Sequence, residues 1–159
     1  MKKVICLGLA AVLACVLCGC GKNSEAAKLN VTLNGTAVSS PLTVEKLGAD
    51  YAFTAPALLK YKGEYAAVVT FDGGTGDAKT PIKSIITSSK NTAPPGILSV
   101  NGIALGSSSA DVLSVFGEPS ANNDVVGWTY REKGAEENEY YLSFYFDDEK
   151  VSNIYVHVP

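Results

Sequence analysis

The stretch GIALGSSSADVLSVFGEP, residues 102–119, specifies its own local structure more sharply than any other part of the chain. Ser108 and Asp111 have the spacing of a capping box, in which each side chain binds the backbone N–H of the other at the start of a helix. Gly117 suits the left-handed backbone that ends a helix, and a proline two residues later prevents continuation. A helix of about two turns is therefore expected over residues 109–116.

A helix of this length is marginal in water on its own, so tertiary packing must hold it in place. Val112 and Phe116 lie four residues apart and Leu113 flanks them, which gives the helix one apolar stripe. Several stretches on either side alternate apolar and polar residues, as half-buried strands do. The expected fold class is α+β, with a short helix packed on an antiparallel β-sheet.

Turn signals divide the expected strands into hairpins. An Asn-Gly pair at 34–35 and another at 101–102 favour two-residue turns, so hairpins are expected over residues 28–39 and 97–105. Residues 121–125 are expected to form a loop. The other strands are expected at residues 58–61, 65–71, 82–87, 127–132, 140–146 and 151–158.

The two halves of the chain follow the same order of elements. In each half a hairpin is followed by a short helix that ends in glycine and then by strands, and Thr43 and Gly48 bound the first of these helices. The segment SSKNTAPPG, residues 88–96, separates the halves as a linker. The chain is therefore expected to contain two small tandem quasi-repeats, an N-terminal α+β unit over residues 28–87 and a C-terminal unit over residues 97–159.

The N-terminus has the pattern of an export signal. Two lysines precede an apolar run, residues 4–16, that is too short to span a bilayer as a mature helix. The sequence Leu-Cys-Gly-Cys at positions 17–20 resembles the bacterial lipobox, in which the last cysteine receives a diacylglyceryl group before cleavage. The expected arrangement is a signal peptide over residues 1–19, a lipidated Cys20, and a polar tether over residues 20–27.

The distribution of cysteines also favours a lipid anchor. All four lie within the first twenty residues, so the expected mature chain keeps only Cys20 and has no disulfide and no thiolate metal site. Two acyl chains on one thioether anchor a protein durably, whereas a single chain holds it only marginally. The expected location is the extracytoplasmic face of the cell membrane. The alternative is an ordinary cleaved signal peptide with an incidental cysteine.

The balance of charge excludes one class of partner. The chain has 13 Lys and Arg against 16 Asp and Glu, and loss of residues 1–19 removes Lys2 and Lys3, which leaves a net charge of −5. Such an acidic chain lacks the positive charge that binding to nucleic acid requires. Its expected partners are the membrane, through Cys20, and an envelope protein, with no cofactor.

The C-terminal half carries a resemblance to a known module. The residues that carry it are Gly102-Ile103-x-Leu105-Gly106-x-Ser108, Asp111-Val112, Phe116-Gly117-x-Pro119, Trp128-x-Tyr130 and Asp148-Glu149-Lys150-Val151. They resemble the β-lactamase-inhibitory-protein-like module, which the small lipoprotein of the outer-membrane β-barrel assembly machinery uses once and the secreted β-lactamase inhibitor uses twice. The chain is also similar to uncharacterised lipoproteins of Gram-positive bacteria. The resemblance covers residues 102–156, and it extends to residues 29–87 only in the order of the elements. It implies the fold of the module, but no inhibitory residue is carried over to this chain.

Few residues suggest catalytic or metal chemistry. The only histidine, His157, lies near the C-terminus, and the serines before the helix have a capping role, so no catalytic pair is expected. Asp72 and Asp77 enclose a glycine-rich loop and are candidates for a calcium site, because carboxylates and carbonyls suit that cation. An ordinary hairpin loop explains the same residues, and no metal site is expected. Acidic side chains also gather at residues 132–139 and 147–149, where solvated turns explain them.

The last two expected strands predict an aromatic surface. Their apolar residues alternate with Tyr141, Tyr145, Tyr155 and His157, so these four side chains are expected on the outer face of one hairpin. For both apolar sets to share the inner face, the loop must hold an odd number of residues or one strand must contain a bulge. Tyrosines are enriched at protein interfaces, which makes these the candidate binding residues. The alternatives are that they only stabilise a solvent-facing sheet or lie beneath the N-terminal half.

Three functions agree with these features. The first is a lipid-anchored cell-envelope protein that acts as a non-catalytic protein-binding or scaffolding module. The second is an inhibitor or modulator of a cell-wall enzyme, which rests on analogy at the level of the fold. The third is a metal-dependent binder or an enzyme that uses the acidic loops.

The lipid anchor predicts the outcome of metabolic labelling with a clickable fatty acid. The wild-type chain is expected to incorporate the label, and Cys20→Ser is expected to lose it, because the thiol of that residue is the acceptor. Cys18→Ser, two positions earlier, is the matched control and is expected to keep the label. A labelled Cys20→Ser variant, or an unlabelled wild type, would contradict the assignment.

Overall fold

The computed structural model describes residues 29–91, 94–124, 127–131 and 141–158. The expected signal peptide, Cys20 and tether lie outside the described residues, as do Tyr140 and the acidic residues 132–139. In the described part of the chain, no helix is both long enough and apolar enough to cross a membrane.

The strands form two antiparallel sheets, so the expected α+β fold class is confirmed. The smaller sheet has the strand order β2 (Thr36–Ala37), β1 (Val31–Leu33), β7 (Leu98–Val100) and β8 (Ile103–Ala104). The larger sheet has the order β3 (Tyr51–Thr54), β4 (Leu58–Tyr61), β5 (Glu64–Phe71), β6 (Ile82–Ser88), β12 (Lys150–His157), β11 (Tyr141–Asp147), β10 (Gly127–Arg131) and β9 (Ala121–Asn123). The helical elements are α1 (Val44–Leu47), α2 (Ser109–Phe116) and a short 3-10 turn, η1 (Ser89–Asn91).

The two halves of the chain share both sheets. Each half contributes a hairpin, a short helix and four strands in the same order. The sequence predicts this order with only three strands after each helix, so β3 and β9 are additional. The hairpins meet where β1 pairs with β7, and the four-strand sets meet where β6 pairs with β12. The larger sheet therefore runs without a break from the N-terminal half into the C-terminal half, through five residue pairs from Ser84–His157 to Ser88–Asn153.

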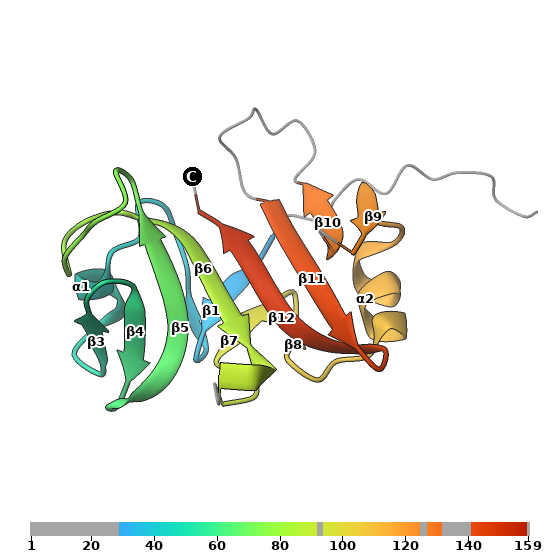
Figure 1. Ribbon diagram of the computed structural model, residues 1–159, viewed down its shortest axis with the longest axis horizontal. Coiled ribbons are helices and arrows are strands. Elements are labelled where there is room, and N and C mark those ends of the chain that lie inside the picture. The colour runs from blue at the N-terminus through green and yellow to red at the C-terminus, as the bar shows by residue number, and fades with distance from the viewer. Residues whose placement is uncertain (1–28, 92–93, 125–126, 132–140, 159) are drawn as a thin grey trace, which may run out of the picture.

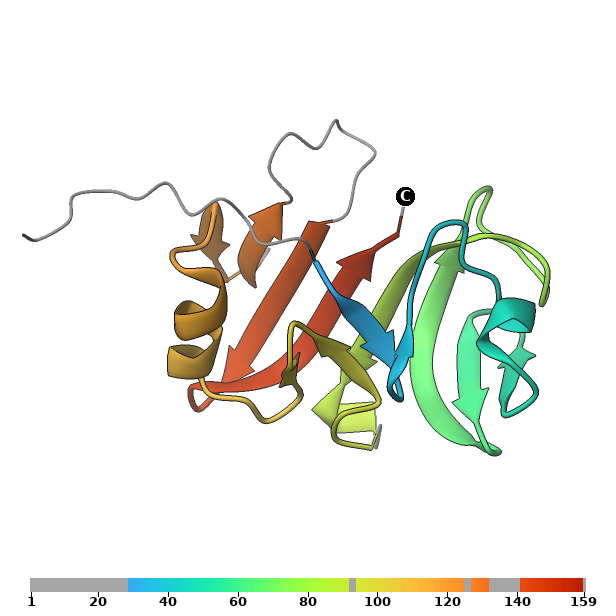
Figure 2. The same ribbon diagram turned by 180° about the vertical axis from the view of Figure 1, so that it is seen from behind.

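The smaller sheet and both helices lie on one face of the larger sheet. Figure 2, which shows the molecule from behind, has β1, β7 and β8 crossing in front of the larger sheet, with α1 and α2 at its two ends. The apolar core fills the space between these layers, and it includes Leu33, Val69, Ile85, Phe144 and Ile154, all fully buried. No described helix or strand covers the opposite face, which Figure 1 shows toward the viewer.

The capping box predicted for α2 is confirmed. The Ser108 hydroxyl accepts a hydrogen bond from the backbone N–H of Asp111 (3.1 Å), and the Asp111 carboxylate accepts one from the backbone N–H of Ser108 (2.9 Å). The hydrogen bonds from Ser108 lower the pKa of the Asp111 carboxyl. Val112 and Phe116 are buried, and the Phe116 ring packs 5.5 Å from that of Phe144 on β11. This contact attaches the short helix to the larger sheet.

The last hairpin contains a β-bulge, one of the two ways in which the apolar residues of both strands can share the inner face. Asp147 pairs with Lys150 across a two-residue turn, yet Tyr145 pairs with Asn153, so one extra residue, Ser152, lies in β12. The Ser152 hydroxyl donates a hydrogen bond to the Tyr145 carbonyl (3.2 Å). Because of the bulge, the apolar residues of both strands reach the core face together.

One expectation about secondary structure is wrong. Residues 121–125 were expected to form a loop, but Ala121–Asn123 form the edge strand β9 and pair with residues 127–129 of β10. The β9 residues have the sequence Ala-Asn-Asn and all three are exposed. The strand therefore has no buried apolar side chain and no alternation that would reveal it in the sequence. Backbone pairing alone defines this strand, and short polar edge strands of this kind protect a sheet from aggregation.

The core contact between α2 and β11 predicts the cost of losing one ring. Phe144 is fully buried against Phe116 and Tyr130, so Phe144→Ala is expected to lower the free energy of unfolding by about 3–5 kcal/mol. Val115→Ala on the exposed side of α2 is the control, with an expected change below about 0.5 kcal/mol. Urea denaturation followed by circular dichroism measures both, and equal midpoints would contradict this account of the core.

Candidate functional site: the open sheet face

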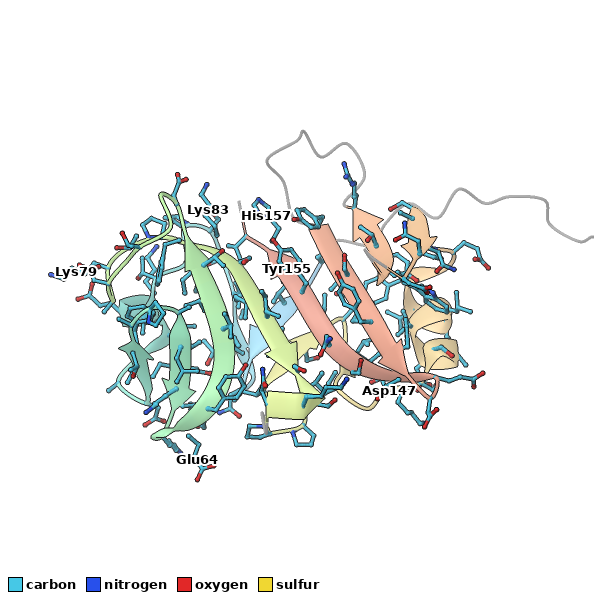
Figure 3. The ribbon with its side chains drawn as sticks, in the orientation of Figure 1. Glu64, Lys79, Lys83, Asp147, Tyr155 and His157 are labelled. Atoms are coloured by element: carbon cyan, nitrogen blue, oxygen red, sulfur yellow. The ribbon has the colours of Figure 1, made fainter. Side chains whose placement is uncertain are left out.

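Four aromatic side chains come together on the open face of the larger sheet. The Tyr141 ring on β11 stacks against two residues of β12, with ring centroids 5.4 Å from Tyr155 and 5.0 Å from His157. Tyr145 follows on the same face of β11, four residues further along. Figure 3 shows Tyr155 and His157 on β12, on the face turned toward the viewer. The register of β11 and β12 thus places all four predicted residues on one face, as the alternation pattern indicates.

The three tyrosines of this group line an open groove of about 470 Å³. Among the described residues that line it, Arg131 on β10 is the one cation and none is a carboxylate. We call it the tyrosine groove. Its lining residues are Ala121, Thr129, Arg131, Tyr141, Ser143, Tyr145 and Tyr155.

The tyrosine hydroxyls are positioned as hydrogen-bonding groups. The hydroxyl of Tyr141 donates to that of Tyr155 (3.1 Å). Burial and this hydrogen bond raise the pKa of Tyr141 to about 12, so its hydroxyl stays protonated at neutral pH. Since only one hydrogen is used between the two oxygens, the Tyr155 hydroxyl keeps its own hydrogen for a further acceptor. The groove therefore combines phenol rings, hydroxyl donors and one guanidinium.

The floor of the tyrosine groove is held by a cross-strand hydrogen bond. Thr129 on β10 pairs directly with Ser143 on β11, and their hydroxyl oxygens lie 2.9 Å apart. Both side chains are buried, so the bond satisfies polar groups that water does not reach. Their small size keeps the floor low between the larger rings of Tyr141 and Tyr145.

The imidazole ring of His157 is held in place by stacking on the Tyr141 ring. Burial lowers the pKa of its imidazole below the ordinary value of 6.5, and the charge of Lys83 lowers it further. The residue that pairs with it on β6 is Ser84, which is 1% exposed and whose hydroxyl lies 2.6 Å from that of Thr70. The hydroxyl of the serine beside this histidine is therefore already engaged with Thr70 on β5.

The carboxylates considered for calcium have other roles. Asp77 accepts hydrogen bonds from the backbone N–H groups of Lys79 (2.9 Å) and Thr80 (3.0 Å), which lower the pKa of its carboxyl. Asp72 lies 3.9 Å from the Lys83 ammonium. Across the described ranges of the chain, no three His, Cys, Asp or Glu side chains gather closely enough to hold a metal ion.

Four residues of the tyrosine groove, Ala121, Thr129, Arg131 and Ser143, were not identified as site residues from the sequence. Ala121 on β9 and the two β10 residues come to the groove only through the pairing of β9, β10 and β11. Alternation along β11 places Ser143 between two tyrosines on the outer face. It does not reveal which strand lies beside β11, so the contribution of β10 was not visible.

Comparisons of this chain with protein-family models, with curated proteins and with solved structures found no match. The geometry of the open face and the pattern of the N-terminus are therefore the basis for the function.

The environment of His157 predicts its titration. As the only histidine of the chain, it can be followed by NMR without assignment ambiguity, and its pKa is expected below 6.5. Lys83→Met is expected to raise this pKa, because a neighbouring positive charge disfavours the imidazolium. Lys79→Met, at the far edge of the molecule in Figure 3, is the control and is expected to leave it unchanged. A pKa above 6.5 in the wild type would contradict the buried, stacked placement.

Proposed function

We propose that this chain is a lipid-anchored cell-envelope protein, attached to the extracytoplasmic face of the membrane through Cys20, that binds another protein without catalysis. The observation that carries the proposal is the stacked group of Tyr141, Tyr155 and His157 on a sheet face that no described helix or strand covers. The partner contacts this face, with the tyrosine groove at the centre of the contact.

The chemistry of the tyrosine groove suits a protein interface. Tyrosine brings a large apolar ring and a hydroxyl at a low cost in side-chain entropy, which is why it is enriched where proteins meet. The rings are already stacked and the Tyr141 hydroxyl already bound, so little further ordering is needed on binding. Preorganisation of this kind favours recognition over mere stabilisation of a solvent-facing sheet.

The charge of the groove indicates the character of the partner surface. Arg131 is the only charged residue among the described residues that line it, although the whole chain has more acidic than basic residues. A partner surface rich in hydrogen-bond acceptors or carboxylates pairs with this guanidinium and with the tyrosine hydroxyls. A strongly basic surface is disfavoured by Arg131.

Inhibition or modulation of a cell-wall enzyme is the narrower form of the same proposal. It rests on the resemblance of residues 102–156 to the β-lactamase-inhibitory-protein-like module. The identity of the captured protein decides between a scaffolding partner and an enzyme whose activity the chain alters.

Site-specific photo-cross-linking in intact cells tests the protein-binding role. A photoreactive phenylalanine analogue at position 155 is expected to form a discrete adduct with one protein, because this position lies within the contact. The same analogue at position 115, on the exposed side of α2 away from the open face, is the control and is expected to form none. Mass spectrometry of the adduct identifies the partner.

A double substitution provides an independent check. Tyr145→Ala/Tyr155→Ala removes two rings from the groove and is expected to abolish recovery of that partner from cross-linked membranes, whereas Val115→Ala retains it. Identical protein sets for the wild type and the double variant would mean that this face is not the interface.

A further inference from the structure

A second groove lies beside β9, β10 and the turn between β11 and β12. Figure 1 shows these elements at one end of the larger sheet. The volume of the groove is about 490 Å³, within the range of roughly 300–1,000 Å³ that small-molecule sites occupy. One wall is aromatic and comes from Trp128, Tyr145 and Phe146, and the other is polar and comes from residues 122–124 and Glu149. We call it the Trp128 groove.

A glycine brings the two strands of the aromatic wall together. Gly127 has a φ of +66°, and a Cβ at this position would collide with the carbonyl oxygen of Phe144 on β11. A larger residue would therefore strain the backbone and force β10 away from β11. The absent side chain also leaves space beside the Tyr145 ring, whose Cδ1 lies 3.2 Å from where the Cβ would be.

The aromatic wall is a preformed platform. The rings of Trp128 and Phe146 lie 4.6 Å apart at a tilt of 57°, and both are half-buried against the apolar core. Their remaining exposed surface lines the groove. The face of an aromatic ring carries negative charge density, which attracts the weakly positive hydrogens of C–H groups. Such a wall suits a ligand that presents one flat, C–H-bearing side.

The polar wall offers both kinds of hydrogen-bonding group. The Asn122 amide can donate and accept, whereas the carboxylates of Asp124 and Glu149 only accept. In the part of the groove lining that the structure describes there is no Lys, Arg or His. Within the described residues, neither carboxylate has an ion-pair partner within 4.0 Å. The wall therefore favours a ligand with several donors and no negative charge.

These two walls together select one class of ligand. Asp124 and Glu149 repel an anion, and a wholly apolar ligand would strip water from amide and carboxylate without replacing its hydrogen bonds. A compact cation would use the carboxylates but not the amide donor of Asn122. A polyhydroxylated ring donates to the carboxylates, pairs with the amide and rests its C–H side on the aromatic wall. We propose that the Trp128 groove binds a neutral saccharide.

This site is separate in chemistry from the tyrosine groove. Among their described lining residues, the two grooves share only Tyr145, and the tyrosine groove has no carboxylate whereas the Trp128 groove has two. Saccharide binding does not require the protein partner proposed above, because all of its lining residues belong to this chain. The sugar titration can therefore fail while protein cross-linking succeeds, and cross-linking can fail while the sugar titration succeeds.

Intrinsic fluorescence tests the proposal directly, because Trp128 is the only tryptophan of the chain. Titration with two neutral probes, the trimer of N-acetylglucosamine and maltotriose, is expected to give a saturable change in emission with at least one of them. Spermidine and a glutamate tripeptide are the charged comparison probes. NMR spectra of the labelled protein, recorded with the same sugar, are expected to show shifts confined to residues that line the groove.

Variants separate a saccharide site from a cation site. Asn122→Ala removes one hydrogen-bonding group and is expected to weaken sugar binding about tenfold. Asp124→Asn and Glu149→Gln keep acceptors but remove charge, so they are expected to change sugar binding less than Asn122→Ala does. Asn91→Ala, on η1 outside the groove, is the matched control and is expected to bind as the wild type does.

Three results would overturn the proposal. The first is no saturable response of Trp128 emission or of the NMR spectrum to either sugar. The second is spermidine binding tighter than both sugars and lost in Glu149→Gln, which would assign the groove to a cation. The third is tighter binding of the glutamate tripeptide than of either sugar, which the two carboxylates should prevent. Thermal unfolding of each variant shows that the fold is retained.

Discussion

The antiparallel pairing of β6 with β12 is the constraint on which the rest of the structure depends. It joins two four-strand sets, each too small to bury a substantial core, into one eight-stranded sheet with a single apolar layer behind it. Pairing of β1 with β7 repeats the connection in the smaller sheet. The open face is continuous for the same reason: Tyr155 on β12 stands directly beside Ile86 on β6, so the residues of both halves form one surface.

Elements with local signals could be predicted from the sequence, and those that depend on distant pairing could not. The Asn-Gly turns, the capping box of Ser108 and Asp111, and the parity rule for the last hairpin each use residues close in sequence. β9 has no such signal, because its residues are polar and exposed. Element order indicated two similar halves, but nothing in either half shows that their sheets merge through β6 and β12.

The residues of the candidate site differ in the same way: some could be predicted from local sequence and others depend on distant strand pairing. Tyr141, Tyr145, Tyr155 and His157 could be assigned to one face because alternation along a strand determines which side each residue takes. The residues that complete the tyrosine groove depend on β10 lying beside β11, and those of the Trp128 groove depend on β9, which was expected to be a loop. Alternation along a strand thus predicts which face of the sheet each side chain lies on. Prediction of a concave site also requires knowing which strands lie beside that strand.

Because β12 lies in the middle of the larger sheet, that sheet cannot form completely until this last strand has been synthesised. Strands β3 to β6 pair with each other locally, but one side of β6 has no neighbour until residues 150–157 have been synthesised. Contacts between segments this far apart in sequence form slowly. Until then the N-terminal half presents a seven-residue unpaired edge that includes Ile82, Ile85 and Ile86, which is the feature that makes an incomplete sheet prone to aggregation. A chain truncated before β12 would keep that edge exposed permanently.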